Sequence, residues 1–305
     1  MKIDLHMHTT ASDGSDTPEE LLEKILAAGY EYFSVTDHDS TSACLRVGRR
    51  LSLMQKGSAD GKQEDGTAGS QDSGSNQLPA FIPGIELSCE DEKGKYHILG
   101  YGYQYEWGNV LRLTHETHAL RMAKLSRRLQ NLREAYGITF PEEELAALYQ
   151  LDNPGKPHIG RLMVKYGYAR SISEAIKGVL NKYSPPEGHI RPEQAIRAVL
   201  ADGGVPVLAH AIYGDGDQLI MGPELGERIE RLMNFGLMGL ECFYSGFSPK
   251  QRQIMLSLAE HYDLYVTAGS DYHGTNKLIE LGDTGLDEEG GTHPRLVEFL
   301  EYVTQ

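Results

Sequence analysis

The start of the chain contains a group of side chains that can bind a metal ion. His6 and His8 are two positions apart, and Asp13 follows in a turn with Gly14. Residues 2–8 alternate like a strand, so both imidazoles point to the same face. Two imidazoles on one face, followed by a carboxylate in a turn, can hold a divalent cation. Two histidines satisfied by their neighbours would give the same short pattern, so the rest of the chain has to decide.

Side chains of the same type recur at or just beyond the carboxyl ends of other expected strands. In a β/α barrel those ends lie on one face, where the active sites of such barrels occur. The metal-type positions are His6, His8, Asp13, His38, Glu86, His97, His210, Asp271 and His273. Imidazole and carboxylate suit zinc, manganese and iron, and nine ligands are too many for one ion. We therefore expect two or three divalent cations (Mn, Fe or Zn), an arrangement that serves phosphate displacement.

The elements that must position these residues alternate between strand and helix. Thr17 can cap a helix, Glu20 completes a capping box, and Gly29 is placed to end that helix. Further strands are expected at 32–36, 80–88, 96–101, 205–209, 238–243 and 264–268, and helices at 42–54, 192–201, 223–235, 249–262 and 294–303. This order is typical of an α/β fold with a mostly parallel, covered sheet. About seven such units favour a closed or nearly closed β/α barrel.

Two segments interrupt the alternation. Residues 107–191 are helical and strongly charged, with helices expected at 110–136, 142–149, 159–166 and 173–181. We expect an inserted helical domain between barrel segments 1–106 and 192–305. Residues 57–77 contain no large apolar side chain and cannot offset their ordering entropy, which predicts a disordered surface loop.

Composition limits the class of protein. The chain has 305 residues, 40% of them hydrophobic, and no apolar run of membrane-spanning length, so we expect no membrane association. Three widely spaced cysteines and the lack of a basic–apolar leader favour a cytoplasmic protein without a cleaved signal peptide. The net charge of −15 argues against double-stranded DNA as a partner. A small anionic substrate held by cations remains compatible with this charge.

The motifs resemble those of the PHP (polymerase and histidinol phosphatase) family. They are the His6-Met7-His8 run with its Asp13, Thr36-Asp37-His38, Gly84-Ile85-Glu86, His97, Ala209-His210 and Gly269-Ser270-Asp271-Tyr272-His273. More narrowly, they resemble stand-alone metal-dependent phosphoesterases whose helical domain interrupts a distorted (β/α)7 TIM-like barrel. The resemblance covers most of residues 1–106 and 192–280.

The resemblance implies three metal sites and a reaction. One site would use His6, His8, Glu86 and Asp271, the second Glu86 as a bridge with His97 and His210, and the third Asp13, His38 and His273. Glu86, His210 and His273 form the expected catalytic group. The implied reaction is attack of a metal-bound hydroxide on a phosphomonoester of a small nucleotide. A 3′,5′-nucleoside bisphosphate would give a nucleoside 5′-monophosphate and phosphate, and 5′-3′ cleavage of short RNA is the alternative.

Substrate contacts are expected from the insertion. Lys156, His158 and Arg161 resemble the segment that grips phosphate in the family. A helix start supplies donors and a favourable dipole for an anion, and arginine can bind phosphate through two hydrogen bonds. The same residues would otherwise be ordinary surface charges. One departure lies after His210, where the family has a proline and a nearby arginine and this chain has Ala211-Ile212-Tyr213.

Other assignments stay open at this point. An amidohydrolase-type reaction on the same barrel often uses a carbamylated lysine as bridge, where this chain has Glu86. A non-catalytic metal-binding module would be expected to lose ligands. Glu241 ends a strand and either lines the pocket or pairs with a neighbour, so it is left outside the site. The remaining histidines are expected at the surface: His115, His118, His261 and His293.

Overall fold

The chain folds around two β-sheets. The computed structural model describes residues 1–60, 78–185, 188–214 and 218–305. The smaller sheet is parallel, with the order β1-β2-β3, and the larger has the order β4-β5-β6-β7-β8. The strands are β1 (Ile3–Asp4), β2 (Tyr32–Phe33), β3 (Ala80–Phe81), β4 (Gly84–Asp91), β5 (Gly94–Tyr101), β6 (Val205–Leu208), β7 (Gly239–Tyr244) and β8 (Tyr265–Gly269).

The two sheets are joined by single contacts. The Leu5 N–H donates to the Ala268 carbonyl at 2.9 Å, and an isolated bridge pairs His38 with Glu86. Among the described strands the pairing thus gives sheets of three and five strands, not the one closed barrel that we expected. Ladder pairing stops early because the chain beyond β1 and β2 bends toward the metal-type side chains. In this part of the chain, backbone groups also bond to side chains. For example, the Met7 N–H donates to the Thr36 hydroxyl at 3.1 Å.

The mostly parallel sheet that we expected is corrected at β5. β4 and β5 form a long antiparallel hairpin in which Ser88 lies opposite His97, and β5 is also antiparallel to β6. The physical reason is the connection, since two residues, Glu92 and Lys93, separate the strands. So short a link can join only antiparallel neighbours.

The helices largely follow the sequence signals. In α1 the Thr17 side chain accepts from the Glu20 N–H, and Gly29 ends the helix with φ 70°. The helices are α1 (Pro18–Ala28), α2 (Ser42–Asp60), α3 (Asn109–Tyr136), α4 (Glu142–Tyr149), α5 (Lys156–Lys165), α6 (Ile172–Gly178), α7 (Pro192–Ala201), α8 (Pro223–Met233), α9 (Pro249–His261) and α10 (Pro294–Val303). Residues 57–60 continue α2, where we expected the disordered loop to begin, because the preceding residues are good helix formers. The rest of that expected loop, 61–77, lies outside the described residues.

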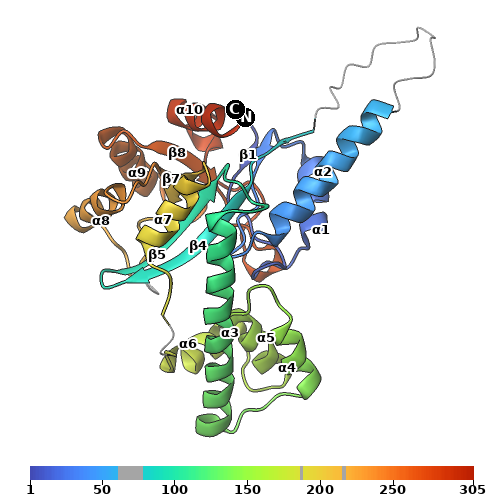
Figure 1. Cartoon of the computed structure of the whole chain (residues 1–305). Helices are drawn as coiled ribbons and strands as arrows, with labels where there is room; N and C mark the ends of the chain where they lie inside the picture. The colour runs from blue at the N-terminus through green and yellow to red at the C-terminus, as the bar shows by residue number, and fades with distance from the viewer. Residues whose placement is uncertain (61–77, 186–187, 215–217) are drawn as a thin grey trace.

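The helices form three groups around the sheets (Figure 1). α8, α9 and α10 lie beside β7 and β8, α1 and α2 lie beside the smaller sheet, and α3 runs from the sheets to the group α4–α6. The far half of α3 packs with α4–α6 in a separate apolar cluster that includes Leu125, Leu132 and Ile159. Within the described part of the chain, no helix is both long and apolar enough to cross a lipid bilayer.

A carboxylate at the end of α7 holds the start of α3. Asp202 accepts from the backbone N–H groups of Asn109 and Val110 at 2.9 and 2.7 Å. It also accepts from the Asn109 side-chain amide at 2.7 Å. The residue at the N-cap, Gly108, has φ 119° and offers no side chain, so Asp202 supplies the missing cap from outside the helix. This cap anchors the long helix that connects the sheets to α4–α6.

We predict that Asp202→Ala lowers the free energy of unfolding by about 1–2 kcal/mol, because the first N–H groups of α3 lose their acceptor. Urea unfolding measures the loss, and amide hydrogen exchange at Asn109 and Val110 localises it. Glu106→Ala is the matched control, since this exposed residue also precedes α3. Unchanged exchange at both amides would contradict the prediction.

Candidate metal centre

A buried carboxylate, Glu86 on β4, lies at the centre of the site. Its side chain is 1% exposed. Oε2 faces ring nitrogens of His6 (3.2 Å), His8 (3.2 Å) and His38 (3.1 Å). Oε1 faces His97 (2.7 Å) and His210 (3.2 Å). Each oxygen of one carboxylate thus addresses its own set of imidazoles, which is the geometry that a bridging ligand needs.

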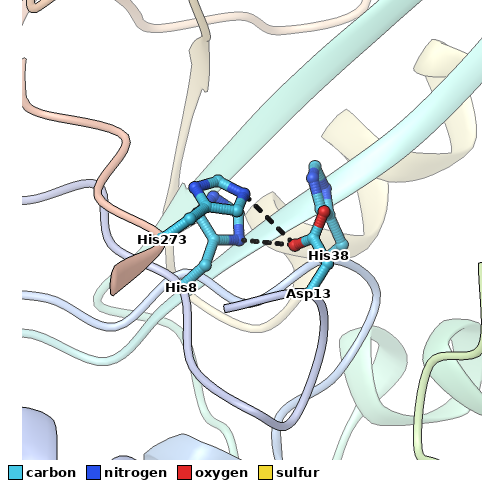
Figure 2. Close-up of side chains that lie close together, drawn as sticks. All are labelled: His8, Asp13, His38 and His273. Carbon is cyan, nitrogen blue, oxygen red and sulfur yellow. Dashed lines mark ion pairs between the residues drawn. The ribbon is translucent and has the colours of Figure 1, made fainter. Parts of the chain in front are cut away.

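A second group forms around Asp13 (Figure 2). Asp13 Oδ1 lies 3.2 Å from His273 Nε2 and 3.8 Å from His8 Nδ1. Together with His38, one ligand atom from each of these four residues lies within 4.8 Å of the others. Four ligand atoms this close can surround one cation.

The structure brings all nine predicted metal-type residues together. The potential metal-binding groups are His8, Asp13, His38 and His273; His6, His8 and Glu86; and His38, Glu86 and His97. His210 and Asp271 border these groups, since Asp271 Oδ1 lies 3.3 Å from His8 Nε2. His8 and His38 each belong to two groups, whereas the resemblance gives each to one site. The division into three sites and the number of cations therefore remain predictions.

The two oxygens of Asp271 have separate partners. Oδ2 accepts from the Tyr244 hydroxyl at 3.1 Å and from the Lys277 ammonium at 2.7 Å. Oδ1 faces the imidazoles of His8 and His6, at 3.3 and 3.6 Å from their Nε2 atoms. Tyr244 and Lys277 thereby orient the carboxylate, and neither was part of the predicted site.

Two further buried carboxylates brace the loops that carry the candidate ligands. Asp37 accepts from the Thr9 N–H at 2.7 Å and from the Ser12 hydroxyl at 2.5 Å. Asp4 accepts from the Ser270 N–H and hydroxyl at 2.9 and 2.6 Å. Because these carboxylates are saturated with hydrogen bonds, they act as structural anchors and not as ligands.

The backbone is unusual at three positions next to the centre. Asp39, His210 and Asp271 have φ values of 51°, 29° and 61°. Positive φ is uncommon for residues with a Cβ, and such strain concentrates at functional sites. His210 and Asp271 follow β6 and β8 directly and contribute side chains to the cluster, whereas Asp39 binds Arg121.

Unpaired polar atoms indicate that the centre fits a cation. His6 Nε2, His8 Nε2, His38 Nδ1, Glu86 Oε2 and His273 Nε2 are buried and have no hydrogen-bond partner among the described residues. Buried polar atoms are normally satisfied, and each exception needs an explanation. All five are nitrogen or oxygen atoms of the kind that ligates Mn, Fe or Zn, and they converge on one place. The donor set therefore fits divalent metal ions.

The protonation of the cluster follows from its crowding. Burial alone would raise the pKa of Glu86, but His38, His97 and His6 hold it well below its usual range. Burial alone would lower the pKa of His8, yet Asp271 and Glu86 raise it to about 9. The carboxylates thus keep a proton on His8 where a bound cation would supply the positive charge instead.

The sequence analysis left Glu241 outside the site, and the structure shows it fully buried in β7 and paired with two residues of the site. Its Oε1 lies 2.7 Å from His6 Nδ1, and its Oε2 accepts from the His210 N–H at 2.8 Å. The first contact places the proton of His6 on Nδ1 and directs Nε2 at Glu86, as for a metal-ligating histidine. The available signal was an acidic residue inside a buried apolar strand, where carboxylates rarely occur unless paired.

A cavity of about 860 Å³ opens beside the centre. Asp13, His38 and His97 line it on one side, and residues of α3 and α5 line it on the other. Lys156 and His158 line it as expected, but Arg161 is exposed and not part of the lining. Burial and Arg161 lower the pKa of His158 to about 4, so its ring is neutral at pH 7. The roles of these three residues in binding substrate stay predictions.

The other histidines divide between surface and structure. His115 and His261 are exposed, as expected. His118 is not a free surface residue, because its Nδ1 donates to the Asp152 carbonyl at 2.7 Å. His293 is only partly exposed, and His189 lines the cavity.

Several known proteins are similar to this chain in sequence. Residues 4–190 match the PHP domain family. The chain is 30% identical over 281 residues to a phosphoribosyl 1,2-cyclic phosphate 1,2-diphosphodiesterase of Eggerthella lenta, which covers 89% of this chain and 94% of that protein. It is 28% identical to the 5′-3′ exoribonuclease Rnm of Escherichia coli (92% and 87% covered) and 26% identical to a 3′,5′-nucleoside bisphosphate phosphatase of Chromobacterium violaceum (89% and 87%).

A solved structure agrees with these matches. A Bifidobacterium adolescentis protein, provisionally assigned as a metal-dependent phosphoesterase, superposes with a TM-score of 0.77 at 26% identity, covering 98% of this chain and 96% of that one. The fold, the histidine–carboxylate centre and these matches define one class of enzyme, the metal-dependent phosphoesterases. The chain belongs to the PHP domain family.

We predict that Glu241→Gln weakens divalent-metal binding by about 10- to 100-fold. Both carboxylate oxygens accept from N–H groups, whereas an amide has one acceptor oxygen, so His6 or the His210 backbone loses its partner. Elemental analysis and titration with Mn²⁺ measure the change. Glu260→Gln, an exposed exchange on α9, is the control, and equal affinities of the two variants would contradict the role of Glu241.

We also predict that metal affinity increases with pH up to about 9. The pKa of His8 is raised to about 9, so below that pH a cation must displace the proton of this ring, and above it that proton no longer competes. The apparent affinity should rise by up to about tenfold per pH unit and then level off. Titrations at pH 7, 8 and 9, with proton release followed in weak buffer, measure this dependence. Affinity that is constant over this range would contradict it.

Proposed function

We propose that this protein hydrolyses a phosphomonoester of a small nucleotide, with a 3′,5′-nucleoside bisphosphate as the leading substrate. The observation that carries the proposal is the convergence of five unpaired, buried ligand-type atoms beside a cavity of about 860 Å³. That volume lies in the range of small-molecule sites. The relative from Chromobacterium violaceum, named for this activity, matches 89% of the chain.

The centre supplies the parts that phosphate hydrolysis needs. Cations held there would lower the pKa of a water molecule and neutralise charge on the phosphoryl oxygens. Glu86 would bridge the two sets of imidazoles, one with each carboxylate oxygen. Asp271 and Asp13 add negative charge that would help to retain the cations. In the reaction a bond forms between the water oxygen and phosphorus, and the ester P–O bond breaks. His210 and His273 are our candidates for giving the proton to the leaving oxygen, since an alkoxide leaves poorly without one.

The helices around the cavity complete the proposal. We assign residues 107–191 as a substrate-capping domain on segments 1–106 and 192–305, within a distorted TIM-like barrel. Arg121 of α3 pairs with Asp39, and the Asn153 side chain donates to the His38 carbonyl, so this region is attached directly to the centre. Lys156 and His158 lie where they would contact the phosphate, and Arg161 would have to turn inward.

Three other substrates compete with this proposal. A cyclic phosphodiester is a candidate substrate because of the relative from Eggerthella lenta. Short RNA is a candidate substrate because of the Rnm relatives. An amide would be the substrate of an amidohydrolase-type reaction. The basic side chains that line the cavity, among them Lys156 and Lys124, favour an anion over a neutral amide.

We expect hydrolysis to be fastest with adenosine 3′,5′-bisphosphate in a panel that also contains a ribose 1,2-cyclic phosphate, 5′-phosphorylated short RNA and an N-acyl amino acid. The product followed is phosphate for the bisphosphate, the ring-opened ribose phosphate for the cyclic ester, nucleoside 5′-monophosphate for the RNA and the free amino acid for the amide. Each is assayed with Mn²⁺, and the metal content is confirmed by elemental analysis. Glu86→Gln is expected to abolish turnover while the circular dichroism spectrum is unchanged, since the bridge is lost. Glu260→Gln should keep full activity. A metal-loaded protein that is inactive on every nucleotide would overturn the proposal.

A further inference from the structure

One buried lysine in the cavity is not explained by the metal centre. Lys124 lies on α3, and the residue is only 6% exposed. It lines the same cavity as His38 and His97. Within the described part of the chain, its ammonium has no hydrogen bond and no carboxylate within ion-pair distance. Lysines are almost never so deeply buried unless they are paired.

The surroundings of Lys124 are themselves positive. Arg121 and Arg128 stand three residues before and four residues after it, on the same face of α3, and both line the cavity. Burial, Arg121 and Arg128 together lower the pKa of Lys124 to about 8. Two carboxylates, Glu90 and Asp39, act in the opposite direction on the pKa of Lys124. His189 lies 3.4 Å from Glu90, and Arg121 binds Asp39.

This arrangement is unfavourable for the protein alone. A buried ammonium loses hydration, and like charges at three- and four-residue spacing destabilise a helix. The arrangement is favourable once an anion enters the cavity, because an ammonium with three donors and little water around it binds phosphate strongly.

We propose that Lys124, flanked by Arg128, binds a second anionic group of the substrate: a phosphate that is not the one hydrolysed. This inference rests on the proposed function, because the reacting phosphate occupies the metal side of the cavity. The enzyme is then selective for phosphate esters with two separate phosphates. Arg121 has a different task, since its guanidinium holds Asp39 and donates to the Ser88 hydroxyl at 3.0 Å.

The kinetic test compares two substrates that differ only in the second phosphate. Lys124→Met should lower kcat/KM for adenosine 3′,5′-bisphosphate by about 10- to 100-fold, the range of a hydrogen bond to a charged group. Its kcat/KM for adenosine 3′-monophosphate should stay within about threefold of the wild-type value. The control, Arg127→Met, removes the same charge from an exposed position on α3 outside the cavity lining and should change neither. Equal losses on both substrates would overturn the proposal.

A binding test separates this inference from the proposed function. Adenosine 5′-monophosphate carries only the second phosphate, and calorimetry should show about tenfold weaker binding to Lys124→Met, with no change for Arg127→Met. If the wild type hydrolyses no nucleotide but shows this loss, the proposed function fails and the anion subsite stands. If inorganic phosphate binds as tightly as the nucleotide, with the same loss in Lys124→Met, the site serves free phosphate and the proposal is wrong.

The stability of the variants excludes a merely structural role. Lys124→Met should have a melting temperature at least equal to that of the wild type, because a buried charge without a partner is removed. Lys124→Arg should keep most of the preference for the bisphosphate, since it retains a donor cation. If Lys124→Met does not fold, Lys124→Gln replaces it in both tests. A large loss of stability in Lys124→Gln would overturn the assignment to ligand binding.

Discussion

The structure depends on one constraint: a buried carboxylate, Glu86, is surrounded by imidazoles that cannot all satisfy it. Five ring nitrogens face its two oxygens, and five ligand-type atoms of the centre have no hydrogen-bond partner among the described residues. An unsatisfied buried polar atom costs roughly 1–3 kcal/mol. Divalent cations held at the centre would offset that cost.

The rest of the fold keeps these groups from relaxing. If the loops were free, the imidazoles would rotate toward water or toward one another. Asp37 prevents this for the loop of residues 9–14, and Asp4 does so for the loop that begins at Ser270. Glu241 fixes His6 and the backbone of His210 at once. Backbone pairing also continues past the strand ends, where the His8 N–H donates to the Tyr272 carbonyl at 2.9 Å and the Asp271 N–H donates to the His6 carbonyl at 2.8 Å.

Residue type and position at strand ends were enough to predict the centre. Most of the nine metal-type residues follow an apolar strand, a local pattern that is visible in the sequence. Two of them differ from that expectation, because Glu86 lies within β4 and His97 lies near the start of the antiparallel β5. Glu241 was left outside the predicted site because its role depends on its contact with His6, more than two hundred positions away. The antiparallel β5 was missed because strand direction depends on connections and not on hydrophobic periodicity. The two-residue turn before Gly94 was the available signal.

Lys124 shows a different limit of sequence reasoning. The pattern Arg121-Lys124-Arg128 on a charged helix is typical of a solvated face, and nothing in α3 alone distinguishes a face toward water from one toward a cavity. The difference arises from Asp202, which sets the start of α3, and from Asp39, which binds Arg121. These contacts place a positive helix face opposite a negative cluster of ligands in one cavity. A chain with a net charge of −15 can then concentrate an anion at one place, because the local field inside a low-dielectric cavity outweighs the screened charge of the distant surface.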